Sequence, residues 1–247
     1  MWIPTSPYNN LPELPPHFTE TIKIFRQTIQ SRVALERLHQ AVNLLPNNEI
    51  LIQTIPILEA QASSEIENIV TTTDNLFKFL DADTQADAAT KEALRYRQAL
   101  WKGMDSLKRC PLSLRTMIAV CSTLRDTDVS VRKLDGTCIA STSSGQVIYT
   151  PPAGEALILE KLHNLAEFLH SPSEMDPLVK MAIAHYQFEA IHPFSDGNGR
   201  TGRVLNILYL VESGLLSQPV LYLSRYIIRN KPKYYAALLN VTKEGAW

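Results

Sequence analysis

The chain has 247 residues, 45% of them hydrophobic and 20% charged, so we expect one large core or two closely packed parts. Its 24 basic and 25 acidic side chains give a formal net charge of −1, which argues against binding to nucleic acid or a membrane surface. We see no signal peptide, no apolar run long enough to span a bilayer, and an odd number of cysteines. These features favour a cytoplasmic protein without a disulfide framework.

The N-terminal arm, residues 4–16, is rich in proline and asparagine and is predicted to be extended. Leu11 and Leu14 are expected to lie on the core. The alternative is that the prolines form a ligand for a partner protein.

Helical patterns dominate the next stretch of the chain. The first helix is indicated by apolar residues at three-to-four spacing, namely Ile22, Phe25, Ile29, Val33 and Leu38. Pro56 is expected to kink the second helix or to mark its first turn. The predicted helices cover residues 18–45, 49–69, 86–104 and 112–125.

The second helix ends in a polar segment, residues 63–68, that allows two interpretations. Ser64 and Glu67 have the spacing of a capping box, in which each side chain bonds a backbone N–H at a helix start. Taken alone, this local interpretation is favoured. The other interpretation depends on a family resemblance, given below.

A β-hairpin is predicted over residues 129–152, where the helical period disappears and Thr, Ile, Val and Tyr alternate with Gly and Ser. Its strands are expected at residues 139–142 and 146–150, with a turn at 143–145. Such a hairpin either has a purely structural role or can receive a strand from a partner. Helices are predicted again over residues 153–169 and 177–191, and apolar residues 221–228 begin the closing helices.

The segment 192–203, HPFSDGNGRTGR, combines several groups suited to phosphate esters. His192 is the group that can take a proton near neutral pH. Asp196 is a hard oxygen ligand suited to Mg²⁺ shared with phosphates. His185, seven residues earlier, could pair with His192 on a metal, but no carboxylate or cysteine completes the set, so a structural role is favoured.

The second half of this segment is predicted to start a buried helix, because apolar residues 204–210 follow it. Gly197, Asn198 and Gly199 would then lie at a helix N-terminus, where free backbone N–H groups and the positive dipole end attract anions. Arg200 and Arg203 are three residues apart and lie on one helix face, where both can bind phosphate.

This segment resembles the signature of the Fic family, His-Pro-Phe-x-Asp/Glu-Gly-Asn-Gly-Arg-x-x-Arg, at every fixed position. The resemblance implies a mainly α protein, in which a helical core with a small β-hairpin flap follows an N-terminal helical region. It implies an enzyme, a protein adenylyltransferase that moves AMP from ATP to a Tyr, Thr or Ser hydroxyl of a target protein, with Mg²⁺ held by Asp196 and His192 as the base.

The resemblance also assigns the surrounding residues. ATP would contact the segment from Gly197 to Arg203, including Thr201 and Gly202. One tyrosine of the pair Tyr234 and Tyr235 would line the adenine end, with Tyr234 the preferred one. The target would pair with the flap at Val147, Ile148 and Tyr149. Residues 63–68 match the family's inhibitory signature as Ser63, Glu67 and Asn68, which implies a bidentate ion pair between Glu67 and Arg203 that excludes the γ-phosphate.

The expected division is an N-terminal region, residues 1–105, with the inhibitory helix at about 49–69, and a catalytic core at 106–247 with the flap at about 129–152. Many relatives continue past the last residue, so a C-terminal truncation or a further domain is one interpretation. Three other functions stay open: removal of AMP with Glu67 orienting water, γ-phosphate transfer of the Doc type, and a non-enzymatic helical interaction domain. The oligomeric state, a homodimer included, is also open.

Overall fold

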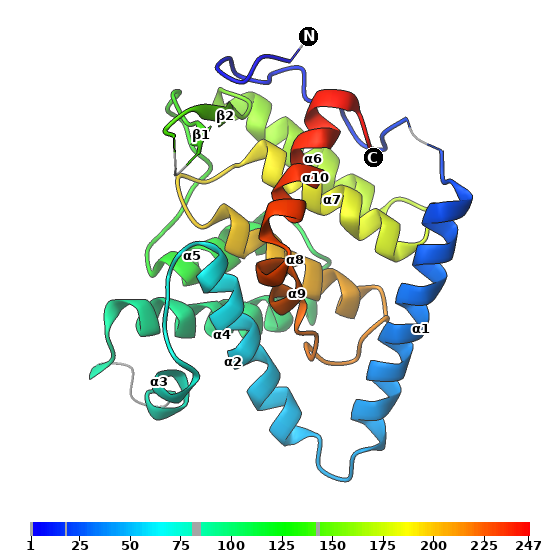
Figure 1. Cartoon of the computed structure of the whole chain (residues 1–247), viewed down its shortest axis with the longest axis vertical. Helices are drawn as coiled ribbons and strands as arrows, with labels where there is room; N and C mark the ends of the chain where they lie inside the picture. The colour runs from blue at the N-terminus through cyan, green and yellow to red at the C-terminus, as the bar shows by residue number, and fades with distance from the viewer. Residues whose placement is uncertain (1, 18, 81–84, 142–143) are drawn as a thin grey trace.

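The computed structural model describes residues 2–17, 19–80, 85–141 and 144–247, and they form a helical protein with one small hairpin (Figure 1). The mainly α fold class predicted from the sequence is confirmed. Within the described residues there are ten helices, α1 to α10, and two strands. None of these helices has the length and hydropathy needed to cross a membrane.

The N-terminal helices are α1 (Ile22–Leu44), α2 (Glu49–Ile66), α3 (Thr73–Lys78) and α4 (Ala88–Leu107). Thr21 caps α1 and Asp87 caps α4, each accepting a hydrogen bond from a backbone N–H of the first turn. Pro56 lies in the interior of α2, which begins seven residues earlier, so this proline does not mark the first turn. Thr72 caps α3 in the same way, accepting a hydrogen bond from the Asn75 N–H at 3.1 Å.

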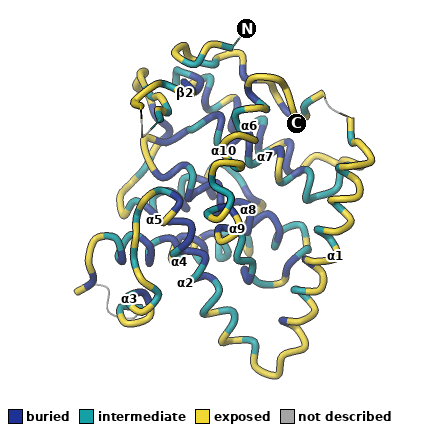
Figure 2. The backbone as a smooth tube through the Cα atoms, in the orientation of Figure 1, coloured by how far each residue is buried: buried dark blue, intermediate teal, exposed yellow. Residues whose placement is uncertain are grey.

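The second half of the chain contains α5 (Leu114–Arg125), α6 (Glu155–His170), α7 (Pro177–Ile191) and α8 (Asn198–Glu212), followed by α9 (Leu223–Arg229) and α10 (Lys231–Glu244). Helix α8 lies at the centre and packs against α4, α5 and α7. Most of its residues are buried, as the dark tube in Figure 2 shows. A helix buried on all sides needs apolar or internally paired side chains around its whole circumference.

The hairpin is shorter than predicted. Strands β1 (Ile139–Ala140) and β2 (Val147–Tyr149) pair antiparallel, with Ile139 opposite Tyr149. The predicted turn begins at residue 143, and residues 142–143 lie outside the described residues. A hairpin of this size is not stable alone, and the Tyr149 hydroxyl ties it to α7 by donating to the carbonyl of Ala190 at 2.8 Å.

The N-terminal arm lies on the core, as predicted. Leu11 and Leu14 are buried, with 2% and 6% of their surface exposed. Lys161 and Asn164 of α6 bind the arm's backbone, with Lys161 Nζ donating to the Leu11 carbonyl at 2.6 Å. The alternative of a free proline-rich ligand does not fit an arm held in this way.

Helix α1 forms where predicted, but the apolar stripe that indicated it faces solvent. Ile22 is 74% exposed and Phe25 is 59% exposed, whereas Leu35 and Val42 face the protein. The exposed edge is visible along α1 in Figure 2. The spacing therefore identified the helix and not its buried face.

Candidate active site

The residues of the 192–203 segment are brought together where α7 turns into α8. Helix α7 ends at Ile191, and His192 follows it in the left-handed conformation with φ 48°. This conformation is rare for a residue other than glycine. Phe194 is fully buried, and the Asn198 side chain accepts from its N–H at 2.9 Å and donates to its carbonyl at 2.8 Å. Asn198 therefore shapes the loop with its side chain and leaves only its backbone for an anion.

The His192 imidazole keeps one buried ring nitrogen, Nδ1, without a hydrogen-bond partner among the described residues. Burial lowers the pKa of His192 to about 4, and the nearby Arg132 guanidinium acts in the same direction. The ring is therefore neutral at pH 7, as a general base requires.

The two arginines of α8 are almost completely buried, with Arg200 2% exposed and Arg203 1% exposed. Arg200 Nη1 is held by Glu92 of α4 at 2.6 Å, while its Nε has no partner among the described residues. Buried guanidinium groups that keep free donors are suited to a charged ligand. Thr201 and Gly202, also predicted to contact ATP, lie in the packed side of α8: a Cβ on Gly202 would lie 2.6 Å from Glu189 Oε1.

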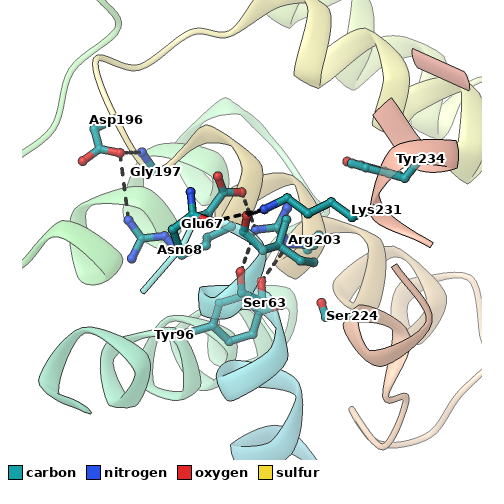
Figure 3. A network of polar contacts seen from close by, with 12 residues as sticks. Ser63, Glu67, Asn68, Tyr96, Asp196, Gly197, Arg203, Ser224, Lys231 and Tyr234 are labelled. Atoms are coloured by element: carbon teal, nitrogen blue, oxygen red, sulfur yellow. Dashed lines mark hydrogen bonds and ion pairs between the residues drawn. The ribbon is translucent and has the colours of Figure 1, made fainter. Parts of the chain in front are cut away.

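Arg203 is bound by the last turn of α2 (Figure 3). Its Nε donates to Ser63 Oγ at 2.7 Å, and its Nη2 donates to the Ser63 carbonyl at 3.0 Å and to Glu67 Oε1 at 2.7 Å. The expected pairing of Glu67 with Arg203 is thus present as one hydrogen bond from Nη2 and not as a bidentate pair, and Ser63 accepts from Nε and also from Nη2. The Glu67 carboxylate packs against Gly199, and a Cβ at this position would clash with it.

Asn68 and Lys231 close the end of α2. Asn68 has a positive φ of 63°, and Lys231 Nζ, from α10, donates to the Ile66 carbonyl at 2.5 Å and to Asn68 Oδ1 at 3.5 Å. A cation at a helix C-terminus satisfies free carbonyls and interacts favourably with the dipole.

Asp196 lies on the rim of the loop with 54% of its side chain exposed. It accepts from the Gly197 N–H and forms an ion pair with Arg125 of α5. Within the described ranges no three His, Cys, Asp or Glu residues gather into a metal site. A single exposed carboxylate beside a phosphate site still suits Mg²⁺, which commonly takes one or two carboxylates and completes its shell with phosphates and water.

A cavity of about 460 Å³, lined on one side by Glu67, lies between the hairpin, α7 and α10. Its size is that of a small-molecule site. The cavity is lined mainly by apolar side chains, with a few polar groups among them. The lining residues include Ile148, Tyr186, Glu189, Tyr235, Leu238 and Leu239. Tyr235 lines this cavity in place of the predicted Tyr234, whose hydroxyl is bonded to His185 Nε2 at 2.8 Å. His185 has the structural role that was favoured, because Asn206 also contacts its Nδ1 at 3.1 Å.

The three hairpin residues predicted to dock a target differ in how far they are exposed. Ile148 and Tyr149 both line the cavity, but Ile148 is 37% exposed, whereas Tyr149 is buried with its hydroxyl bound to α7. Val147 is half-buried and paired with Ala140. Of the three residues, Ile148 is the most exposed.

Four residues of the site were not found from the sequence: Glu92, Arg125, Arg132 and Glu189. Glu189 had one usable signal, because it is a lone carboxylate in an otherwise apolar turn of α7. Burial raises the pKa of Glu189 to about 7, and the nearby Glu67 carboxylate acts in the same direction. Glu92 lies in α4 and Arg125 at the end of α5. Nothing in the sequence around them indicated a place in the site.

Comparisons with known proteins agree with the geometry. A family model described as Fic/DOC family N-terminal matches residues 25–105, and one described as Fic/DOC family matches residues 111–210. The protein adenylyltransferase fic-1 of Caenorhabditis briggsae is 40% identical over 92 residues, which are 36% of this chain and 17% of that protein. A probable protein adenylyltransferase of Aquifex aeolicus is 37% identical over 98 residues, which are 40% of this chain and 28% of that protein. The chain thus matches less than a third of the length of each of these relatives.

Solved structures show the same fold. A Fic family protein from Desulfovibrio desulfuricans has a TM-score of 0.73 at 21% identity, over 93% of this chain and 69% of that one. Fic-1 from Caenorhabditis elegans, as a fragment, has a TM-score of 0.60 at 17% identity, over 87% and 65% of the two chains. The two family models, the complete signature from His192 to Arg203 and the shared fold together show that the chain belongs to the Fic/DOC family.

Proposed function

We propose that this protein transfers AMP from ATP to a hydroxyl side chain of a target protein. The observation that carries the proposal is the meeting, at one helix start, of a neutral imidazole, free backbone N–H groups and two buried arginines. A cavity of about 460 Å³ adjoins them through Glu67, which lines the cavity and accepts a hydrogen bond from Arg203. The relatives named protein adenylyltransferase support the same reaction. An interaction surface alone would not need buried arginines next to a proton acceptor.

In the proposed reaction, adenosine occupies the cavity and the phosphates lie over residues 197–199. Arg200 and Arg203 bind the β- and γ-phosphates. The target hydroxyl gives its proton to His192, and its oxygen bonds to the α-phosphorus. The bond from that phosphorus to the bridging oxygen of the β-phosphate breaks, and pyrophosphate leaves. Positioning and charge stabilisation supply most of the acceleration, as in phosphoryl transfer generally.

Asp196 is the residue that would hold Mg²⁺, after exchanging its ion pair with Arg125 for the metal. The ion would neutralise charge on the phosphates. The target is proposed to pair with the hairpin at Ile148 by backbone hydrogen bonds, which give affinity without fixing the target's sequence.

The proposed regulation is internal. Glu67 occupies an Arg203 donor that the γ-phosphate needs, and its negative charge repels that phosphate. Residues 1–105 would then form a regulatory region and residues 106–247 the catalytic core. A charge-assisted hydrogen bond contributes about 1.5–3 kcal/mol, which corresponds to roughly 10- to 100-fold in nucleotide affinity.

The test compares Glu67→Gly with Glu65→Gly, an exposed glutamate two residues earlier on the same helix. Each variant is incubated with a cell lysate and ATP labelled on the α- or the γ-phosphate. We expect Glu67→Gly alone to place the α-label on protein, to bind ATP more tightly in calorimetry, and to lose the activity when His192→Ala is added. Transfer of the γ-label would instead show a phosphotransferase, and no transfer of either label would refute the proposal.

A further inference from the structure

Arg132 is a buried charge that the reaction described above does not use. It lies in the irregular segment between α5 and β1, yet it is only 8% exposed. Segments without regular structure seldom bury an arginine, because removing a guanidinium from water is costly unless its donors are satisfied. The partners of Arg132 therefore indicate what it does.

The donors of Arg132 bind three consecutive carbonyls at the end of α7. Its Nε donates to the His192 carbonyl at 2.8 Å, and its Nη2 donates to the Ile191 carbonyl at 3.3 Å. Its backbone N–H donates to the Pro193 carbonyl at 2.9 Å. Nη2 also donates to the carbonyl of Pro152, three residues after β2.

These contacts fall where the backbone needs support. The last carbonyls of α7 have no partner within the helix, and a cation at that end also interacts favourably with the helix dipole. His192 itself has a φ of 48°, a conformation that persists in a residue other than glycine only when its surroundings enforce it. Arg132 supplies bonds on both sides of this residue.

We propose that Arg132 is the positioning residue of His192: it holds the backbone that aims the imidazole at the reacting hydroxyl, and it joins this backbone to the base of the hairpin. The inference rests on the proposed function, because it concerns the base of that reaction. One side chain would then align the base with the strand on which the target docks, since Pro152 follows the hairpin directly.

The charge of Arg132 acts on the same ring. It disfavours an imidazolium at His192, as burial does, whereas Glu67 of α2 and Asp196 of the loop favour one. Among these groups, Arg132 is the cation that opposes the two carboxylates.

The kinetic test is made in the Glu67→Gly protein with three further changes: Arg132→Ala, Arg132→Lys and, as the control, Lys133→Ala, a 65% exposed neighbour. Because a misplaced catalytic group can cost ~10²-fold in rate, we expect Arg132→Ala to lower kcat about 100-fold while ATP affinity changes less than twofold. Methylguanidinium added to the solution replaces the missing side-chain group, and it should raise the kcat of Arg132→Ala at least about tenfold. It should have no effect once His192→Ala is added. Lys133→Ala should keep the parent rate.

A threefold or smaller loss in Arg132→Ala, or a loss that lies wholly in ATP affinity, overturns the proposal. If circular dichroism shows that Arg132→Ala is unfolded, Arg132→Lys decides. Lysine keeps the charge but cannot reach all the carbonyls, so a fall in kcat at unchanged ATP affinity supports the proposal and the parent rate overturns it.

A measurement without turnover separates this inference from the proposed function. The imidazole of His192 is titrated by NMR in the otherwise unaltered protein and in Arg132→Ala, and its signal is assigned among the six histidines by comparison with His192→Ala. We expect the titration to move to higher pH in Arg132→Ala, and an unmoved titration overturns the proposal. Failure of Glu67→Gly to transfer AMP would refute the proposed function alone, because this titration needs no activity.

Discussion

Ser63→Ala and Ser64→Ala form a matched pair that tests how α2 is held on the buried Arg203. Both serines are fully buried, and they are adjacent on one helix. Ser63 Oγ accepts from Arg203 Nε at 2.7 Å, whereas Ser64 Oγ has no hydrogen-bond partner among the described residues. The same chemical change is therefore expected to have opposite consequences at neighbouring positions.

Ser63→Ala leaves a donor of a 1% exposed guanidinium without an acceptor. Leaving a buried donor unsatisfied costs about 1–3 kcal/mol, and more for a charged group. In a chain of this length each kcal/mol lowers Tm by about 2–4 °C, so we expect a fall of about 2–12 °C. Ser64→Ala removes an unpaired hydroxyl and is expected to be neutral or slightly stabilising.

The assay is thermal unfolding followed by circular dichroism, with urea unfolding as a second measure of the free-energy change. The double variant Ser63→Ala with Glu67→Gly measures the coupling between the two residues that accept from Arg203. Because they share a partner, the free-energy change of the double variant should differ from the sum of the two single changes by about 0.5–3 kcal/mol. Equal destabilisation by Ser63→Ala and Ser64→Ala would refute the reasoning, because the Arg203 bond would then contribute nothing.

Two further changes test other parts of the structure by the same measurement. The folded-state pKa of Glu189, about 7, lies above its ordinary value of 4.5, so ionising this group costs stability above pH 7 and little below pH 4.5. Glu189→Gln should therefore stabilise by about 1–3 kcal/mol at pH 8 and far less at pH 5, and an equal effect at both would contradict this. Leu14→Ala should destabilise by about 2–4 kcal/mol, whereas Leu134→Ala, at an 84% exposed residue, should change stability by less than about 0.5 kcal/mol; equal values would mean that the arm is not part of the core.

The sequence predicted those residues of the site that lie close together along the chain. His192, Asp196 and Arg203 lie within one turn and one helix start, so their spacing alone brings them near each other. Leu11 and Leu14 could be placed because a large apolar residue in a short arm is most stable when buried. Ser63 and Glu67 lie 140 and 136 residues from Arg203, and only the resemblance to a known signature joined them before the structure did.

The contacts that could not be predicted are those between different helices, because the sequence does not show which helix faces pack together. Glu92 reaches Arg200 across 108 residues, and nothing in α4 distinguishes this carboxylate from those in solvent. Tyr234 and Tyr235 are adjacent, so their identity could not tell which ring faces the cavity; the rotation of α10 decides it. The stripe from Ile22 to Val33 shows the same limit, because periodicity reveals an apolar face but not what that face contacts.

The geometry at Arg203 indicates how the proposed inhibition can be relieved without moving α2. Arg203 donates three hydrogen bonds to the end of α2. Two are accepted by Ser63, which is fully buried, and one by Glu67, whose side chain is 34% exposed at the C-cap. A rotation of the Glu67 side chain breaks only its own bond and leaves Ser63 to hold the guanidinium in place. The Glu67 carboxylate and Arg203 Nη1 both lie against Gly199, where the absence of a Cβ leaves room for a phosphate oxygen once the carboxylate has turned away. The exchange costs one charge-assisted hydrogen bond of about 1.5–3 kcal/mol, which a γ-phosphate in the same position can replace.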